Sequence, residues 1–180
     1  MSFYPDLSPY TYHVEEVNSK LLNISWLSVK HPFPNGSVSE AFLTQLWTYC
    51  EKSVNDFRGF HQCDFCKATQ PTSVTRNGKE LRLGAAEVWV PGNNGIVYIA
   101  PNLVYHYVTV HDYMPPREFI DAVLDSPQPN TSAYIEFLDR LDVDYQFIDD
   151  DGEIIAAGGR YRELAANEEY RAALKVLHAQ

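Results

Sequence analysis

Cysteine is scarce in this chain, with three residues among 180. An odd number of thiols, two of them in a C-x-x-C pair, does not suit a disulfide framework and is typical of a reducing compartment. We therefore expect a cytoplasmic protein. Basic residues are scarce as well, because 14 Lys and Arg stand against 24 Asp and Glu and give a formal net charge of −10. Such a surface repels phosphate backbones, so we expect no nucleic-acid partner; a basic protein partner, or nothing more than good solubility, fits this charge better.

Long apolar runs and targeting signals are also missing. No stretch approaches the ~20 apolar residues of a membrane span. The N-terminal MSFYPD has neither the basic n-region nor the apolar h-region of a signal peptide. We therefore expect no membrane association. The glycine-rich phosphate-binding motifs, H-E-x-x-H and G-x-S-x-G do not occur, so nucleotide binding through those motifs and the corresponding hydrolase classes have no support. The acidic turn at 149–152 does not fit a calcium loop, because Phe147 stands where an acidic ligand is required.

Apolar and aromatic residues are abundant instead, and their spacing predicts an α+β fold. Hydrophobic residues make up 45% of the chain, enough for one substantial core. Residues 21–27 predict a strand with Leu22, Ile24 and Trp26 on one face. Ser37 and Glu40 have the spacing of a capping box, which predicts a helix that ends near residue 54. The alternation and turns of residues 73–100 predict an antiparallel β-meander.

The second half of the chain predicts packed helices and a C-terminal helical extension. Residues 101–113 fit a helix or a strand, and the proline at the start favours the helix. A further helix is expected over 117–124. The proline-rich stretch 126–132 predicts a linker between a core domain, 1–125, and an extension, 133–180. In the extension we expect a helix at 133–141, a hairpin around 149–152 and a helix over 162–178.

The segment HQCDFC is the strongest indication of chemistry in the chain. It brings His61, Cys63 and Cys66 within six residues. In an extended segment His61 and Cys63 point to the same side, and the turn through Cys66 returns the second thiol toward them. Thiolates and an imidazole at this spacing suit a divalent metal, zinc above all.

A structural zinc site needs a fourth ligand, for which three residues are candidates. His106 and His111 lie in an aromatic segment expected to pack near the meander, and we favour His106 because His111 could instead end a helix. Cys50 is the third candidate. Its position on the apolar stripe of the helix that starts near Ser37 favours a buried core residue instead.

Three other interpretations of the segment compete with a structural zinc. The thiols could be incidental and the histidine a buried, hydrogen-bonded one. They could form a redox dithiol, although no thioredoxin-like βαβ pattern surrounds them. An open three-ligand site could support hydrolysis or deamination, but the H-x-E motif of zinc deaminases is missing. Residue 62 is Gln, and Glu87 would have to act as a remote base.

Four segments carry a family resemblance: YPDLSPY at 4–10, RGFHQCDFC at 58–66, AEVWVPG at 86–92 and YIAPNLVYHYV at 98–108. In these segments the chain resembles a family of uncharacterised bacterial proteins. The resemblance covers about residues 3–125 and ends at the linker, so that residues 131–180 lie outside it. It implies a soluble bacterial protein and carries no activity.

Together these patterns predict a small, acidic, zinc-binding protein that acts as a binding or interaction module, with the zinc in a structural role. Small acidic bacterial proteins of this kind often neutralise a partner, as immunity or antitoxin-like proteins do, although this analogy is only associational. The alternative is a metal-dependent hydrolase or deaminase-type enzyme with a three-ligand zinc site. The number of protein ligands separates these two hypotheses.

Overall fold

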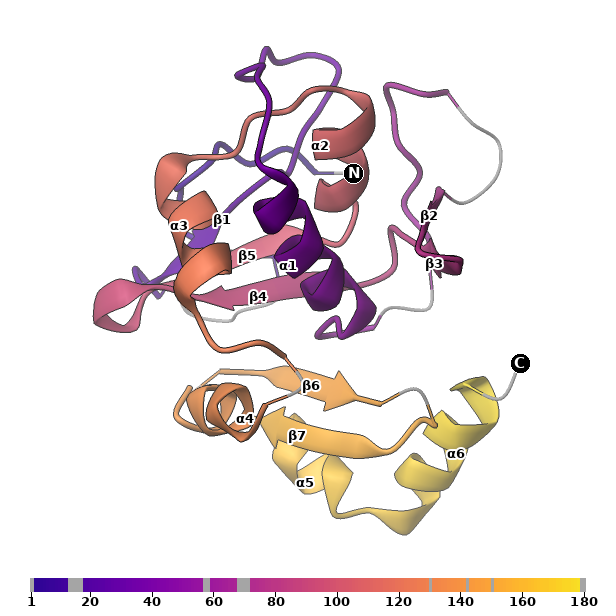
Figure 1. The fold of residues 1–180 in the computed structure, drawn as a ribbon. Helices are drawn as coiled ribbons and strands as arrows, with labels where there is room; N and C mark the ends of the chain where they lie inside the picture. Colours follow the sequence, from indigo (N-terminus) through magenta and orange to yellow (C-terminus); the bar gives the residue numbers. More distant parts are fainter. Residues whose placement is uncertain are drawn as a thin grey trace.

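The fold is taken from a computed structural model, which describes residues 2–12, 18–56, 59–67, 72–129, 131–141, 143–149 and 151–178 (Figure 1). Residue 58 of the family-like segment and residue 150 of the acidic turn lie outside these ranges. No helix in the described ranges has the length and apolar character needed to cross a membrane.

A three-stranded sheet lies at the centre of the fold. Its strands are β1 (Leu21–Asn23), β5 (Val97–Pro101) and β4 (Glu87–Pro91), in the order β1-β5-β4. β4 and β5 pair antiparallel across the short helical turn η1 (Asn93–Gly95), whereas β1 pairs parallel to β5. Every residue of β4 and β5 is buried, which is typical of strands covered on both faces. The predicted α+β class is confirmed.

Three helices pack around this sheet: α1 (Glu40–Glu51), α2 (Val104–Val110) and α3 (Arg117–Asp125). α1 and α3 contact each other and β4. The residue that caps α1 is Ser39 rather than Ser37, because the Ser39 hydroxyl accepts a hydrogen bond from the Phe42 N–H. The ambiguous segment 101–113 is helical over α2, as the proline favoured.

Two strand predictions differ from the structure in detail. The predicted meander consists of two separate hairpins, since β2 (Ser73–Arg76) and β3 (Lys79–Arg82) pair with each other outside the central sheet. Asn77 and Gly78 both have positive φ and form the predicted two-residue turn. The strand at 21–27 ends at Asn23, because Ser25 has a φ of 64° that breaks the extended backbone. Leu22 is half-buried, whereas Ile24 and Trp26 are buried.

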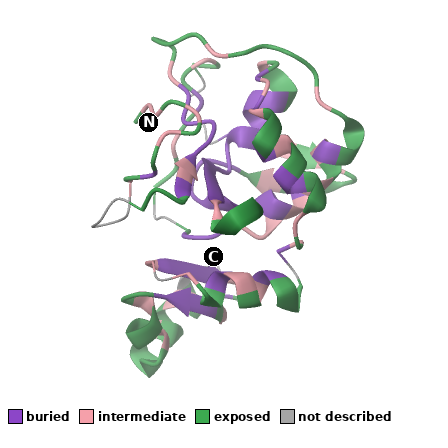
Figure 2. Cartoon of the chain, turned by 90° about the vertical axis from the view of Figure 1, so that its left-hand side faces the viewer, coloured by how far each residue is buried: buried purple, intermediate pink, exposed green. Residues whose placement is uncertain are grey.

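The C-terminal extension contains the expected helices and hairpin, and its final helix is divided in two. Its elements are α4 (Ser132–Asp139), β6 (Tyr145–Ile148), β7 (Ile154–Gly158), α5 (Tyr161–Ala165) and α6 (Glu168–His178). The hairpin lies beside β4, and Tyr134 of α4 donates a hydrogen bond to the Trp89 carbonyl at 2.8 Å (Figure 1). Figure 2 shows that the hairpin strands are largely buried and that the last helices are exposed. The division into domains at residues 125 and 133 stays a prediction.

Candidate metal centre

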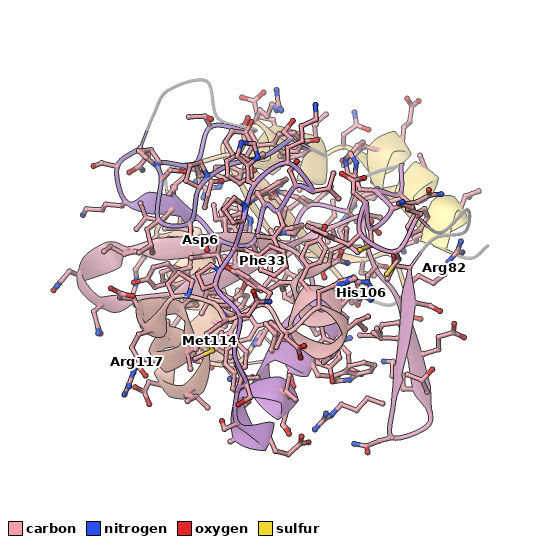
Figure 3. All side chains as sticks on the ribbon, turned by 90° about the horizontal axis from the view of Figure 1, so that it is seen from above. Asp6, Phe33, Arg82, His106, Met114 and Arg117 are labelled. Atoms are coloured by element: carbon pink, nitrogen blue, oxygen red, sulfur yellow. The ribbon has the colours of Figure 1, made fainter. Side chains whose placement is uncertain are left out.

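Four side chains from two distant segments meet at one point of the molecule. They are Cys63 and Cys66, from the loop after α1, and His106 and His111, from α2 and its C-terminal end. One ligand atom from each residue lies within 4.8 Å of the other three. Cys63 and His106 are buried, His111 is half-buried and Cys66 is exposed, so the cluster lies at the edge of the core. Figure 3 labels His106 on α2.

The chain around the two cysteines forms a tight turn over residues 64–67. The backbone N–H groups of Phe65 and Cys66 donate hydrogen bonds to Cys63 Sγ. Such donors stabilise a thiolate, because they place partial positive charge against the sulfur. Lys67 then leaves the turn with a φ of 50°, a left-handed conformation that is uncommon for a residue with a Cβ. The loop is therefore shaped to present both sulfur atoms to one point.

Phe65, at the tip of this turn, anchors the loop to the core. Its ring packs edge-on against Phe33 and Tyr107, with centroid separations of 5.4 and 5.9 Å. It also lies 5.2 Å from the His111 ring. Because Phe65 lies between the two cysteines in sequence, this packing fixes the thiols relative to α2 without any direct bond.

α2 supplies both histidines because the helix ends between them. His106 lies within the helix and His111 is its C-cap, where the His111 N–H donates to the Tyr107 carbonyl. Asp112 follows with a φ of 53°, which turns the chain away. Residues five apart on a regular helix do not share a face. The end of the helix at His111 therefore allows its imidazole to come beside that of His106.

The spacing of the ligand atoms fits a tetrahedral metal ion. His106 Nε2 and His111 Nε2 are 3.2 Å apart, and three sulfur–nitrogen pairs lie at 3.2–3.3 Å. With Zn–N and Zn–S bonds of about 2.05 and 2.3 Å, a tetrahedral site separates two nitrogens by about 3.3 Å and a sulfur from a nitrogen by about 3.6 Å. The cluster is slightly tighter than this ideal, and all four atoms converge on one volume.

Hydrogen bonding alone does not account for this arrangement. His111 Nε2 lies 3.2 Å from Cys63 Sγ, from Cys66 Sγ and from His106 Nε2. A ring nitrogen has one proton or one lone pair in the ring plane, so it makes one good hydrogen bond and not three. A shared cation at the centre would satisfy all four atoms at once.

The electrostatics of the cluster also suit a metal. Burial, together with the neighbouring His111, lowers the pKa of His106 to about 4, and burial lowers the pKa of His111. Both imidazoles are therefore neutral near pH 7 and have lone pairs to offer. Burial raises the pKa of the Cys63 thiol to about 11. A Cys63 thiolate would not persist here by itself, and a divalent cation would supply the charge that holds it ionised.

His61 lies outside this group of four. Its backbone N–H donates to the Gly84 carbonyl at 2.8 Å. Gly84 has a φ of 102°, and a Cβ at this position would lie 2.1 Å from the His61 carbonyl oxygen. His61 therefore aligns the loop through its main chain. The proposal that His61 and Cys63 point together assumed an extended strand, whereas this segment has no strand pairing.

Two other residues considered from the sequence are held elsewhere. Cys50 is 5% exposed on α1, and its Sγ lies 3.6 Å from the Asn102 carbonyl, as expected for a core residue. The Glu87 carboxylate is 1% exposed and accepts hydrogen bonds from Tyr10, Asn55 and Trp89. Neither residue is among the four that converge. A carboxylate buried with three donors is poorly placed to act as a remote base.

The fold and the cluster together define an α+β protein with a possible Cys₂His₂ metal site. Residues 2–124 match a protein family described as a domain of unknown function, DUF7919. Because this match spans more than half of the 180 residues, the chain belongs to that family. All four cluster residues lie within the matched range. No curated protein and no solved structure matches the chain.

Proposed function

We propose that this protein is a binding module stabilised by a structural zinc ion, with Cys63, Cys66, His106 and His111 as the four ligands. The observation that carries the proposal is the convergence of two sulfur and two nitrogen atoms within 4.8 Å. Two thiolates with two imidazoles are a typical donor set for zinc. Magnesium and calcium prefer harder oxygen ligands.

A structural role follows from the number of ligands. Four protein side chains complete a tetrahedral zinc site and leave no position for a water molecule. The ion would join the loop 59–67 to the end of α2, two segments separated by about 40 residues of chain. Metal binding would therefore contribute to folding rather than to a reaction.

The enzyme alternative requires features that the described residues do not offer. A catalytic zinc site has three protein ligands and an open position, together with a base that can reach the bound water. Here a fourth ligand atom lies beside the other three, and Glu87 is buried in a hydrogen-bond network of its own. We therefore favour the binding module.

The partner that we propose is a basic protein in the cytoplasm. The chain has a net charge of −10, and opposite charge accelerates encounter and favours correct orientation. Neutralisation of a basic partner, as an immunity or antitoxin-like protein would achieve, is one form that this function could take.

Metal analysis of untagged protein tests the zinc proposal. We expect about one zinc per chain, and X-ray absorption with two sulfur and two nitrogen neighbours. Cys66→Ser should reduce the zinc content strongly, whereas His61→Ala, a change in the same loop, should leave it unchanged. A metal content below about 0.2 per chain would remove the site. Three protein ligands and a solvent oxygen would instead favour the enzyme.

A further inference from the structure

The two cysteines of the candidate metal site differ in their access to solvent. Cys66 is exposed, whereas Cys63 is 1% exposed. A small reagent dissolved in water therefore reaches the sulfur of Cys66 first. Oxidants attack accessible thiolates, and buried thiols react slowly. The site thus presents one sulfur atom to the solvent and keeps the other behind it.

The buried sulfur is close enough to react with the exposed one in a second step. The two sulfur atoms lie within 4.8 Å of each other, and a hydrogen bond joins the two side chains. Because a disulfide bond is about 2.05 Å long, the sulfurs have at most about 3 Å to travel. The turn over residues 64–67 supplies the C-x-x-C spacing that redox dithiols use.

The third cysteine of the chain lies outside this pair. Cys50 is 5% exposed on α1, and its Sγ lies 3.6 Å from the Asn102 carbonyl. It is not among the four residues that converge. Its sulfur therefore reaches neither the solvent nor the cluster, and a disulfide within one chain joins Cys63 to Cys66.

Contacts that do not involve the sulfur atoms hold the loop 59–67 in place. Phe65 packs against Phe33 and Tyr107, and the His61 N–H donates to the Gly84 carbonyl at 2.8 Å. These contacts persist when the sulfurs change their chemical state. The loop therefore stays beside α2 after oxidation, and a reductant regenerates both thiols where they can bind the ion again.

The thiolates are the electron donors of this site, because zinc does not change its own oxidation state. We propose that the site is a peroxide-sensitive switch, in which the exposed Cys66 is oxidised first, Cys63 completes a disulfide with it, and the zinc ion is released. This inference rests on the proposed zinc site and adds its regulation. A disulfide offers no thiolate to the ion and leaves two imidazoles as ligands. Oxidation thereby removes the metal link between the loop and the end of α2.

The reaction balances with hydrogen peroxide as the oxidant. The Cys66 thiolate attacks one peroxide oxygen, the O–O bond breaks, and a sulfenic acid and a hydroxide ion form. The Cys63 thiolate then attacks the Cys66 sulfur, the S–S bond forms, and the S–O bond breaks to release a second hydroxide. The two sulfurs lose two electrons and the peroxide gains two. Two protons from the solvent convert the hydroxides to water.

Peroxide treatment of the full-length, zinc-loaded protein tests the inference. Zinc content is measured first, and a chromogenic chelator then records zinc release after one equivalent of hydrogen peroxide is added. We expect about one zinc released per disulfide formed, and much slower release with the chelator alone. The tryptic peptide 59–67 contains both cysteines and should be lighter by two hydrogen atoms. Cys50 should remain a free thiol, and dithiothreitol followed by zinc should restore the starting zinc content.

Two histidine substitutions separate the roles of the two sulfurs, because histidine also binds zinc. Cys66→His should release zinc about tenfold more slowly in peroxide, since the remaining thiol is buried. Cys63→His keeps the exposed thiol and should accumulate a sulfenic acid at Cys66 that dimedone traps. If either variant fails to fold, the peptide masses of the wild type still decide the outcome.

Three results would overturn the inference in a wild type that contains zinc at the start. They are retention of zinc in peroxide, oxidation of the peptide 59–67 without an internal disulfide, and oxidation of Cys63 before Cys66. Protein that contains no zinc before peroxide is added would instead reject the metal site itself. The two failures are therefore distinguishable.

Discussion

The Cys₂His₂ cluster and the Glu87 site both join distant segments of the chain through polar side chains. At Glu87, Tyr10 donates to one carboxylate oxygen at 2.5 Å, and Asn55 and Trp89 donate to the other at 3.0 Å. In the cluster, His111 Nε2 has three neighbours at 3.2 Å and can make one good hydrogen bond. Protein groups alone satisfy the first site, whereas hydrogen bonds among the four ligand atoms do not satisfy the second.

This difference separates a structural hydrogen-bond network from a possible metal site. Buried polar groups normally find partners within the protein, and a group that does not calls for an explanation. The network at Glu87 also reaches the extension, because Asn55 Oδ1 accepts from the Gln146 N–H. The two sites therefore connect different parts of the chain. The cluster connects the loop 59–67 to α2, and the Glu87 network connects the N-terminal segment to the extension.

Removal of the metal should reduce the stability of the folded chain more than any of the substitutions considered below. At a free zinc concentration 1,000-fold above its Kd, a bound ion stabilises the folded chain by about 4 kcal/mol. Chelation should therefore lower Tm by about 8–16 °C in a chain of this size, as measured by calorimetry. His61→Ala, which alters the same loop outside the cluster, should melt with wild-type zinc dependence. Equal melting with and without chelator would contradict a structural metal.

Glu87→Leu should have the next largest effect, because it leaves three buried donors without an acceptor. Each unsatisfied donor costs about 1–3 kcal/mol, so we expect a loss of about 3 kcal/mol or more. Urea unfolding at pH 7 measures this loss, and zinc content should stay at the wild-type value. Loss of zinc in a variant that remains folded would show that the two sites are coupled rather than independent.

Glu87→Gln should have a smaller effect that depends on pH. Burial raises the pKa of Glu87, although its three hydrogen bonds oppose the shift. Between the unfolded pKa of about 4.3 and the raised folded pKa, the folded chain binds more protons, so its stability falls as pH rises. Glutamine cannot titrate. Unfolding free energies from pH 4 upward should therefore show the wild type losing stability relative to Glu87→Gln, and an increase would contradict the raised pKa.

The fold was predictable where local patterns decide the structure. Apolar spacing predicted helices close to α1, α3 and α4, and the Asn77-Gly78 pair predicted the β2–β3 turn. The parallel pairing of β1 with β5 was not predictable, because it joins residues about 75 positions apart and no local signal encodes a partner. At Ser25, where the extended backbone breaks, the backbone N–H donates to Asp6, again a distant contact.

The candidate metal cluster was predictable in its residue types, but the sequence did not single out the four residues that converge. The C-x-x-C pair and both α2 histidines were candidates, but the short spacing from His61 to Cys63 suggested a local ligand. The better signal was H-x₄-H at 106 and 111, which falls within the H-x₃₋₅-H spacing common in Cys₂His₂ sites. This spacing brings both histidines together only if α2 ends before His111, and helix ends are the least certain part of a prediction from sequence.

Cys50→Ala should have the smallest effect and separates the third cysteine from the other two. Cys50 is buried and its thiol contacts the Asn102 carbonyl, so the change removes a small apolar group and one weak hydrogen bond. We expect a loss of about 1 kcal/mol in urea unfolding and an unchanged zinc content. Burial raises the pKa of this thiol well above its usual value, so it should also resist alkylation in the folded chain. A fall in zinc content would place Cys50 at the metal after all, because its packing role alone predicts a loss of stability without a loss of zinc.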